Sequence, residues 1–102
     1  ELFVGKTADA IISEQSPEHF FFVCGKLCEL LFRAIPPRVI IKTLTDRLVE
    51  RCDEDLRGAI VEKAAFYELR CRQGNKAIFH LEAFVAQVMA MTKSSFEGME
   101  WE

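Results

Sequence analysis

The run from residue 70 to residue 86 limits the possible folds more than any other part of the sequence. One helical pattern ends at Gly74-Asn75, and a second set of apolar residues at helical spacing follows it. Glycine often follows a helix end, where it takes the left-handed backbone conformation, and asparagine can cap a helix start. Because the link is so short, we expect the two helices to form an αα-hairpin, with Gly74 in the left-handed conformation.

Helical periodicity extends through nearly all of the chain, and no stretch alternates for long with a period of two. Ser16-Pro17-Glu18 predicts a helix start, because serine caps exposed amides, proline fits the first turn and glutamate complements the helix dipole. Ile35-Pro36-Pro37 ends one helix and begins another, and Asp53-Glu54-Asp55 can cap the next. The predicted fold class is all-α, a bundle of about five helices. They are expected over about residues 2–14, 17–34 and 37–52, from the cap at 53–55 to about 73, and from 75 to about 93.

The helical spacing also predicts which residues face the core. The helix over residues 17–34 differs from the others, since its apolar side chains wrap most of its circumference; such a helix is central or covered by another chain. Within it, Gly25 marks either a close helix contact or a tolerated glycine. In the other four helices the expected inward residues are Val4, Ala8, Ile11, Ile12, Ile40, Ile41, Leu44, Leu48, Cys52, Ile60, Ala64, Tyr67, Cys71, Ile78, Leu81, Phe84 or Val85, Val88 and Met89.

The composition indicates one small folded domain. The chain has 102 residues, 50% of them hydrophobic, and a formal net charge of −3, which argues against a dedicated nucleic-acid binder. It has no apolar window long enough to span a bilayer and no signal peptide. It starts inside a helical pattern without an initiator methionine, so we expect a piece of a longer protein. We expect a helical domain over residues 1–93 and an acidic, frayed tail over 94–102, with Trp101 in that tail.

The motifs of enzyme chemistry are missing from the sequence. The five glycines form no phosphate-binding loop, so we expect neither catalysis nor a cofactor in this chain. Free thiols that pack as small apolar groups are the preferred interpretation of the four cysteines. A zinc site at Cys24 and Cys28, or a Cys71–His80 nucleophile pair, is a weaker alternative, because the further ligands or a base-orienting group are lacking.

The charged and aromatic residues leave two questions open. Arg70, Arg72 and Lys76 form a basic group that could contact DNA weakly, whereas the basic residues between 33 and 51 alternate with acids and predict a solvated helix face. Nine phenylalanines exceed the need of a five-helix bundle. On composition alone, a tightly filled core and contact with a partner are equally good explanations of that surplus.

The run from Lys76 to Ala86, with Ala64, Ala65, Tyr67 and Glu68 before it, closely resembles the C-terminal end of small subunits of the third type in eukaryotic replication factor C, the ATP-driven loader of the sliding DNA clamp. The resemblance covers essentially the whole chain. It includes Ile35-Pro36-Pro37 with the following residues 39–42, and the segment 22–31. That segment departs from the family at Cys24 and Cys28, where an arginine and a tyrosine are expected.

The resemblance implies a collar domain. In that family the C-terminal helical domains of five subunits pack side by side and hold the AAA+ ATPase modules in a spiral. ATP and Mg would then bind in the missing N-terminal part of the parent, and the chain would be nuclear and act in replication and repair. Its partners would be other replication factor C subunits, with the sliding clamp and primer–template DNA contacted by the whole complex. Self-association of the isolated domain is conceivable, and no membrane is expected.

Interface residues are expected on the fourth and fifth helices. Motif likeness and helical geometry select Tyr67, Glu68, Arg70, Lys76, His80 and Glu82. The alternative function is a free-standing helical bundle that binds an apolar ligand or a partner helix in a groove.

Overall fold

The structure, a computed structural model, contains five α-helices and no strand among the residues that it describes. These are residues 2–13, 15–74 and 76–100, with side chains described from 5 to 94 within those ranges. The predicted all-α class and number of helices are confirmed. The helices are α1 (Leu2–Ser13), α2 (Pro17–Phe32), α3 (Pro37–Val49), α4 (Glu54–Gln73) and α5 (Ala77–Glu100).

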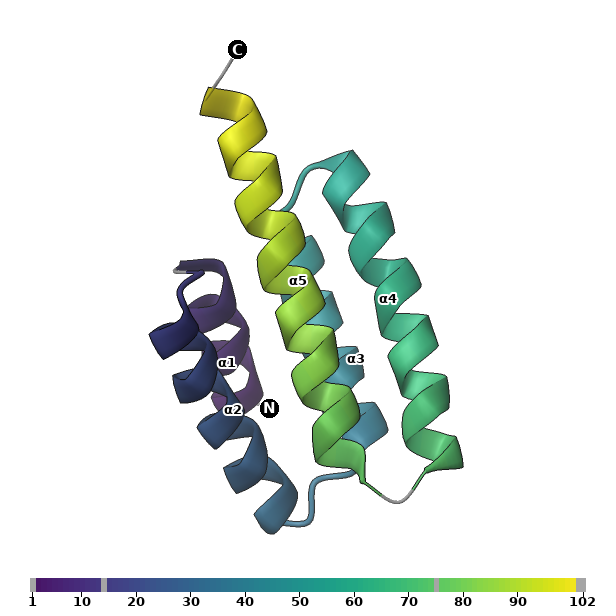
Figure 1. Cartoon of the computed structure of the whole chain (residues 1–102). Coiled ribbons are helices and arrows are strands. Elements are labelled where there is room, and N and C mark those ends of the chain that lie inside the picture. Colours follow the sequence, from purple (N-terminus) through teal and green to yellow (C-terminus); the bar gives the residue numbers. More distant parts are fainter. Residues whose placement is uncertain (1, 14, 75, 101–102) are drawn as a thin grey trace.

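Helix α5 lies at the centre of the bundle. It runs between α2 and α4, with α3 behind it and α1 beside α2 (Figure 1). It contacts all four other helices, and α3 packs against both α1 and α4. Helices α4 and α5 are antiparallel neighbours joined by a short link, so the predicted hairpin is present. The Cα radius of gyration of 13.0 Å is that of a compact domain of about 100 residues.

Two helix starts have the predicted caps. Ser16 precedes α2, and its Oγ accepts a hydrogen bond from the His19 amide at 3.1 Å, while Pro17 fills the first helical position. Asp53 precedes α4, and its Oδ1 accepts from the Leu56 amide at 2.9 Å. Each cap satisfies one of the amides that a helix start leaves without an intrahelical acceptor. The predicted Asn75 cap lies outside the described residues.

Among the described residues, the one with a left-handed backbone lies at the end of α2, where the sequence did not indicate it. Ala34 has φ 67°, and the Ile35 amide donates to the Leu30 carbonyl at 3.2 Å while the Ala34 amide donates to Leu31 at 2.9 Å. This pair of hydrogen bonds is the Schellman arrangement, which needs one left-handed residue after the helix. Helix α2 therefore ends at Phe32, two residues earlier than expected, and the Pro36-Pro37 pair follows at once.

The prediction of a left-handed Gly74 is wrong. Gly74 is extended, with φ −116° and ψ 175°, a conformation that any residue can adopt. Its amide donates to the Arg70 carbonyl at 3.1 Å. A Cβ at this position would lie 3.3 Å from the Nε2 atom of His80. Crowding by the next helix, rather than backbone conformation, therefore favours glycine here.

The core follows the helical spacing closely. Of the expected inward residues, Tyr67, Cys71, Ile78 and Ile12 are half-buried and Val4 lies outside the described side chains. The fully buried large side chains are Phe84, Ile11, Leu27, Leu30, Ile40, Ile41, Leu44, Leu48, Ile60, Leu81 and Val23. Helix α5 continues to Glu100, past the boundary expected at residue 94, while the frayed state of the tail stays a prediction and Trp101 is outside the described residues.

Candidate protein interface

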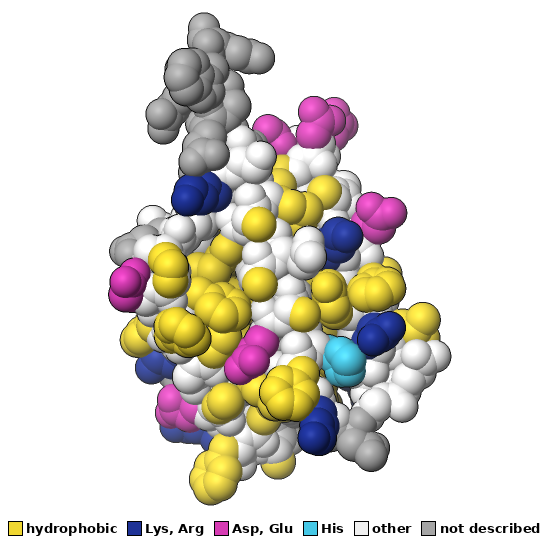
Figure 2. Space-filling view, viewed as in Figure 1, with side chains coloured by type: hydrophobic (Ala, Val, Ile, Leu, Met, Phe, Trp, Pro, Cys, Tyr) yellow, Lys and Arg dark blue, Asp and Glu magenta, His cyan; other side chains and the backbone are white. Residues whose placement is uncertain are grey.

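Among the described side chains, seven large hydrophobic ones are exposed and lie outside the buried core. All of them belong to α2, α4 or the first turn of α5: Phe21, Phe22, Phe32, Val61, Phe66, Leu69 and Phe79. In the view of Figure 2, hydrophobic side chains gather over α2 and along the α4–α5 side, with charged groups between them. Since these residues are not needed to fill the core, they are the first candidates for contact with another molecule.

The first candidate surface lies where α4 ends and α5 begins. We call it the hairpin-end surface, made of Phe66, Arg70, Lys76, Phe79 and His80. The Arg70 guanidinium lies 5.6 Å from the centroid of the Phe66 ring, and the Lys76 ammonium lies 5.7 Å from that of Phe79. Each pair combines a cation with an aromatic face at cation–π distance. The surface is therefore both basic and aromatic.

His80 is the half-buried member of this surface. Its Nε2 atom faces Gly74 at the helix link. No hydrogen bond of its ring is found among the described residues.

The six predicted interface residues do not form one site. Arg70, Lys76 and His80 share the hairpin-end surface. Tyr67 is turned toward the core: its ring meets Phe84 edge-on at 6.3 Å between centroids, and it meets the neighbouring Phe66 ring at 4.9 Å.

Glu68 and Glu82 lie on two other faces of the molecule. Glu68 forms an ion pair of 2.7 Å with Arg72 along α4 and borders a groove between α3 and α4. Glu82 lies on the α2 side of α5, within hydrogen-bond reach of the Cys24 thiol. The predicted residues thus lie on three different faces, because spacing along one helix does not reveal which neighbour covers it. Their part in an interface stays a prediction.

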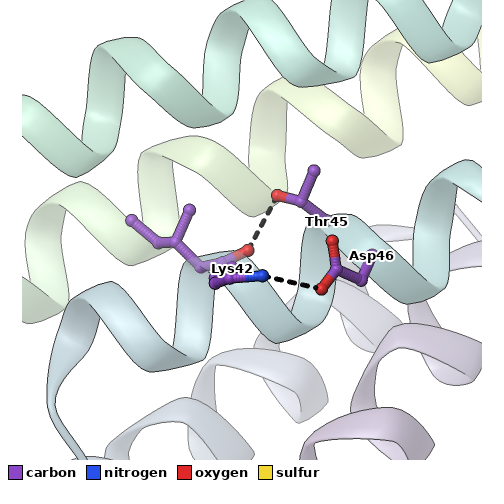
Figure 3. A network of polar contacts seen from close by, with 4 residues as sticks. Lys42, Thr45 and Asp46 are labelled. Carbon is purple, nitrogen blue, oxygen red and sulfur yellow. Dashed lines mark hydrogen bonds and ion pairs between the residues drawn. The ribbon is translucent and has the colours of Figure 1, made fainter.

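A shallow groove of about 430 Å³ runs between α3 and α4. Its apolar floor includes Ile41, Val61 and Ala64, and charged side chains stand at its rim. At the rim, the Lys42 ammonium lies 3.3 Å from the Asp46 carboxylate, and the Thr45 hydroxyl donates to the Ile41 carbonyl at 2.7 Å (Figure 3). These rim groups already have partners within α3, which fits the predicted solvated, mixed-charge face.

The second candidate surface is one that sequence reasoning did not select as a site. We call it the α2 seam: Phe21, Gly25, Cys28 and Phe32, all exposed. Phe21 is 71% exposed and Phe32 is 92% exposed, the two most exposed of the large hydrophobic residues described. The steps of four, three and four residues place the set on one side of the helix. That spacing is the sequence pattern that could have indicated this surface. It is hard to recognise because α2 is apolar on nearly every side.

The cysteines offer little chemistry. All four are free thiols. Burial, with a smaller effect of Glu82, raises the pKa of the Cys24 thiol to about 11, and burial followed by Glu68 raises that of Cys71. A raised pKa disfavours the nucleophilic thiolate, so Cys71 is poorly suited to the weaker alternative of a Cys71–His80 nucleophile.

Metal and membrane contacts were tested on the described part of the chain. There, no group of three or more histidine, cysteine, aspartate or glutamate side chains converges as metal ligands would. The Nε2 atom of His19, a histidine on the same helix as Cys24 and Cys28, lies 2.6 Å from the Ala10 carbonyl. None of the described helices is long and apolar enough to cross a membrane.

Comparison with known proteins gives one consistent result. Residues 1–96 match the family model described as "Replication factor C subunit 3, C-terminal domain". The chain is 46% identical to human replication factor C subunit 3 over 101 residues, which are 98% of this chain and 28% of that protein. It is 46% identical to the Arabidopsis thaliana subunit 3 over 92% of this chain and 27% of that protein. It is 40% identical to Schizosaccharomyces pombe replication factor C subunit 5 over 98% of this chain and 28% of that protein. The chain thus spans a little more than a quarter of the length of these relatives.

Proposed function

Because this chain belongs to the family of replication factor C subunit 3 C-terminal domains, we propose that it is a collar domain that joins its own subunit to neighbouring subunits of a clamp loader. Since the family consists of subunits of replication factor C, the partners of this domain are other replication factor C subunits. The oligomerisation role, the loading of the sliding clamp onto primer–template DNA in replication and repair, and a nuclear location are parts of the proposal. They rest on the resemblance of the sequence to this family.

The observation that carries the proposal is the exposure of large apolar side chains over a complete core. A monomer rarely keeps so much aromatic surface in water unless something covers it. On the hairpin-end surface, Phe66 is 50% exposed and Phe79 is 57% exposed, and each lies beside a cation. Aromatic residues and arginine are the groups that most often supply binding energy in protein interfaces. This composition supports contact with a protein.

We propose that the chain itself is not an enzyme. Its sequence holds no phosphate-binding loop, and its cysteines with raised pKa values are weak nucleophiles. ATP and Mg would bind to another part of the whole subunit. In this proposal the domain contributes to loading by holding the ATPase modules in place rather than by contacting nucleotide.

The α3–α4 groove favours a second candidate function, the binding of an apolar ligand or a partner helix. Its floor is apolar and its volume of about 430 Å³ is within the range of ligand sites. It is open and shallow, however, and Glu68 and Arg72 at its rim already pair with each other. We therefore place this function second.

The test is co-expression of the whole subunit that carries this domain with the other clamp-loader small subunits. The double variant Arg70→Glu with Lys76→Glu reverses the charge of the hairpin-end surface, so the share of neighbouring subunits retained by a tag on this subunit should fall about tenfold or more. A matched control is Lys6→Glu with Lys93→Glu, which changes the net charge equally at exposed sites on α1 and α5.

The control variant should assemble like the unmodified subunit. An unmodified subunit that stays a monomer in the presence of the others would refute the proposed function. Equal retention of both double variants would show that the hairpin-end surface does not take part in assembly.

A further inference from the structure

Gly25 has no structural reason to be a glycine within this domain. A Cβ atom at Gly25 would meet nothing within 4 Å among the atoms that surround it, and the residue lies in the middle of α2. A glycine in a helix interior costs about 1 kcal/mol relative to alanine. The close helix contact that the sequence allowed is therefore absent inside the described domain. Gly58 of α4 has equally open surroundings, so it is the place of Gly25 between exposed rings, and not the open space alone, that points to a partner.

The larger neighbours of Gly25 leave a notch at the glycine, where the helix surface is lower than on either side. Phe21 lies one turn before it, and Cys28 and Phe32 follow on the same side, so a small residue stands between large exposed rings. When two helices pack, a side chain of one fits between four residues of the other, and a small residue there allows close approach. The α2 seam thus has the form of one half of a helix–helix contact.

Carboxylates border the seam on both sides. At about 100° per residue, Glu18 and Glu29 follow on one side of the stripe, and Cys24 follows on the other side. Beyond Cys24 stands Glu82 of α5, whose charge helps to raise the pKa of the Cys24 thiol. Glu29 is already paired with Arg33 at 3.4 Å, whereas no ion pair to Glu18 or Glu82 is found among the described residues. Glu18 also complements the dipole at the start of α2, and both carboxylates would attract a partner that carries positive charge.

The charges around the α2 seam favour one of two possible partners, a second copy of this chain or a helix of a different protein. A second copy of the chain would bring the same seam, with the same acidic border, against the first, and like charges across an interface are costly. The basic residues of α2 itself are engaged: Arg33 pairs with Glu29, and Lys26 lies 5.3 Å from the Phe22 ring centroid. A different helix with lysine or arginine beside its apolar stripe fits better.

We propose that the α2 seam receives one amphipathic helix of a neighbouring subunit, which places a large apolar side chain over Gly25 and basic side chains beside Glu18 and Glu82. This inference rests on the proposed assembly function and names the chemistry of the partner. It also implies two contact faces, since the seam and the hairpin-end surface lie on helices α2 and α4 at opposite sides of α5 (Figure 1).

The test compares two glycines in the whole subunit, co-expressed with its neighbours. Gly25→Leu fills the notch, while Gly58→Leu makes the same change at an exposed α4 glycine whose Cβ would also meet nothing within 4 Å. Both variants gain helix propensity, so neither should lower the melting temperature of the subunit. Gly25→Leu should lose about tenfold or more in subunit retention, and Gly58→Leu should not.

A second measurement identifies the occupant. A photoreactive maleimide on the exposed Cys28 thiol, in a Cys71→Ala background, should crosslink within the assembled complex to one helix flanked by lysine or arginine. Cys28→Ser should remove that product. Crosslinking to a second copy of this chain, or to an acidic segment, would overturn the assignment.

The outcomes separate the two proposals. If Gly25→Leu assembles normally while the Arg70/Lys76 charge reversal prevents assembly, the seam is not an interface and the proposed function stands. If the unmodified subunit does not assemble with the others, both proposals fall.

Discussion

The guanidinium of Arg51, in the turn that follows α3, lies 3.0 Å from the carboxylate of Asp9 on α1. Arg47, one turn earlier, lies 4.0 Å from the same carboxylate, and its guanidinium passes over Gly5, where a Cβ atom would approach it to 3.2 Å. One acid thus joins two helices through two arginines. These side chains remain partly exposed, so water and salt weaken the attraction.

Asp9→Asn should lower the free energy of unfolding by about 0.5–1 kcal/mol at pH 7 and low salt. The substitution removes the charge that holds α1 to α3 while keeping the shape of the side chain. Urea unfolding of the purified domain measures the effect, which should shrink at 1 M salt. The control is Asp46→Asn, which breaks an exposed pair within α3 and should cost about 0.3–0.5 kcal/mol. Equal losses at low and high salt would contradict an electrostatic origin.

Ala34→Gly should stabilise the domain by about 0.5–1 kcal/mol. Ala34 is held at φ 67°, where an L side chain costs about 1–2 kcal/mol that glycine avoids, and the greater freedom of glycine in the unfolded chain offsets part of that gain. Thermal unfolding checks the sign. Ala90→Gly, at an exposed position inside α5, should instead destabilise by about 1 kcal/mol. A loss of stability in Ala34→Gly would mean that the left-handed conformation is not kept in solution.

Gly74→Ala tests whether His80 is the reason for glycine at the helix link. The backbone of Gly74 is extended and accepts alanine, but the new Cβ would lie 3.3 Å from the imidazole. The substitution should cost up to about 1 kcal/mol in the natural background. In a His80→Ala background it should be neutral or stabilising by about 0.5 kcal/mol, because alanine restricts the unfolded chain. A double-mutant cycle by urea unfolding measures the coupling, and a coupling of zero would exclude contact between the two residues.

The sequence predicted the elements of the fold because helix signals are local. Ser16 and Asp53 cap helices through bonds to residues three positions later, and such contacts depend only on nearby chain. The helix ends were harder to predict. Glycine at residue 74 suggested a left-handed turn, yet its role is to leave room for His80. The left-handed conformation is found at Ala34 instead, and alanine is not a residue type that indicates it. Contact with His80 decided the first case, and the hydrogen bonds that end α2 decided the second.

The candidate interface was predicted only in part for the same reason. Arg70 and Lys76 do lie together with exposed rings, as their places on either side of the hairpin link indicated. Tyr67 and Glu82 turn toward other neighbours, because the packing of α5 between α2 and α4 determines which face each side chain joins. The α2 seam could be recognised only after the buried side of α2 was known, since the sequence of this helix is apolar around most of its circumference.

Phe84→Ala should destabilise the domain by about 3–5 kcal/mol. The ring is fully buried in α5 and meets the edge of Tyr67, so its removal leaves a cavity in the centre of the bundle. Phe32→Ala is the matched control: it removes the same side chain at a position that is 92% exposed, and it should change stability by less than about 0.5 kcal/mol. Urea unfolding of the isolated domain compares the two. A large loss for Phe32→Ala would show that this ring supports the fold rather than a surface for partners.

The buried Cys24 thiol should make the domain lose stability in alkaline solution. Burial, with Glu82 and Cys28 as smaller causes, raises its pKa in the folded chain from 9.0 to about 11. Its contribution is therefore fully present below pH 9. As the pH rises from about 9 to 11, the unfolded chain releases this proton while the folded chain still holds it, so the free energy of unfolding falls. The fall attributable to Cys24 should reach on the order of 2 kcal/mol, since one pKa unit corresponds to about 1.4 kcal/mol.

Urea unfolding at pH 8, 9, 10 and 11 should show a steeper decline for the natural chain than for Cys24→Ala. Cys28→Ala, at an exposed thiol on the same helix, should follow the natural chain. Identical slopes for the natural chain and Cys24→Ala would show that the Cys24 thiol ionises as readily in the folded chain as in the unfolded one.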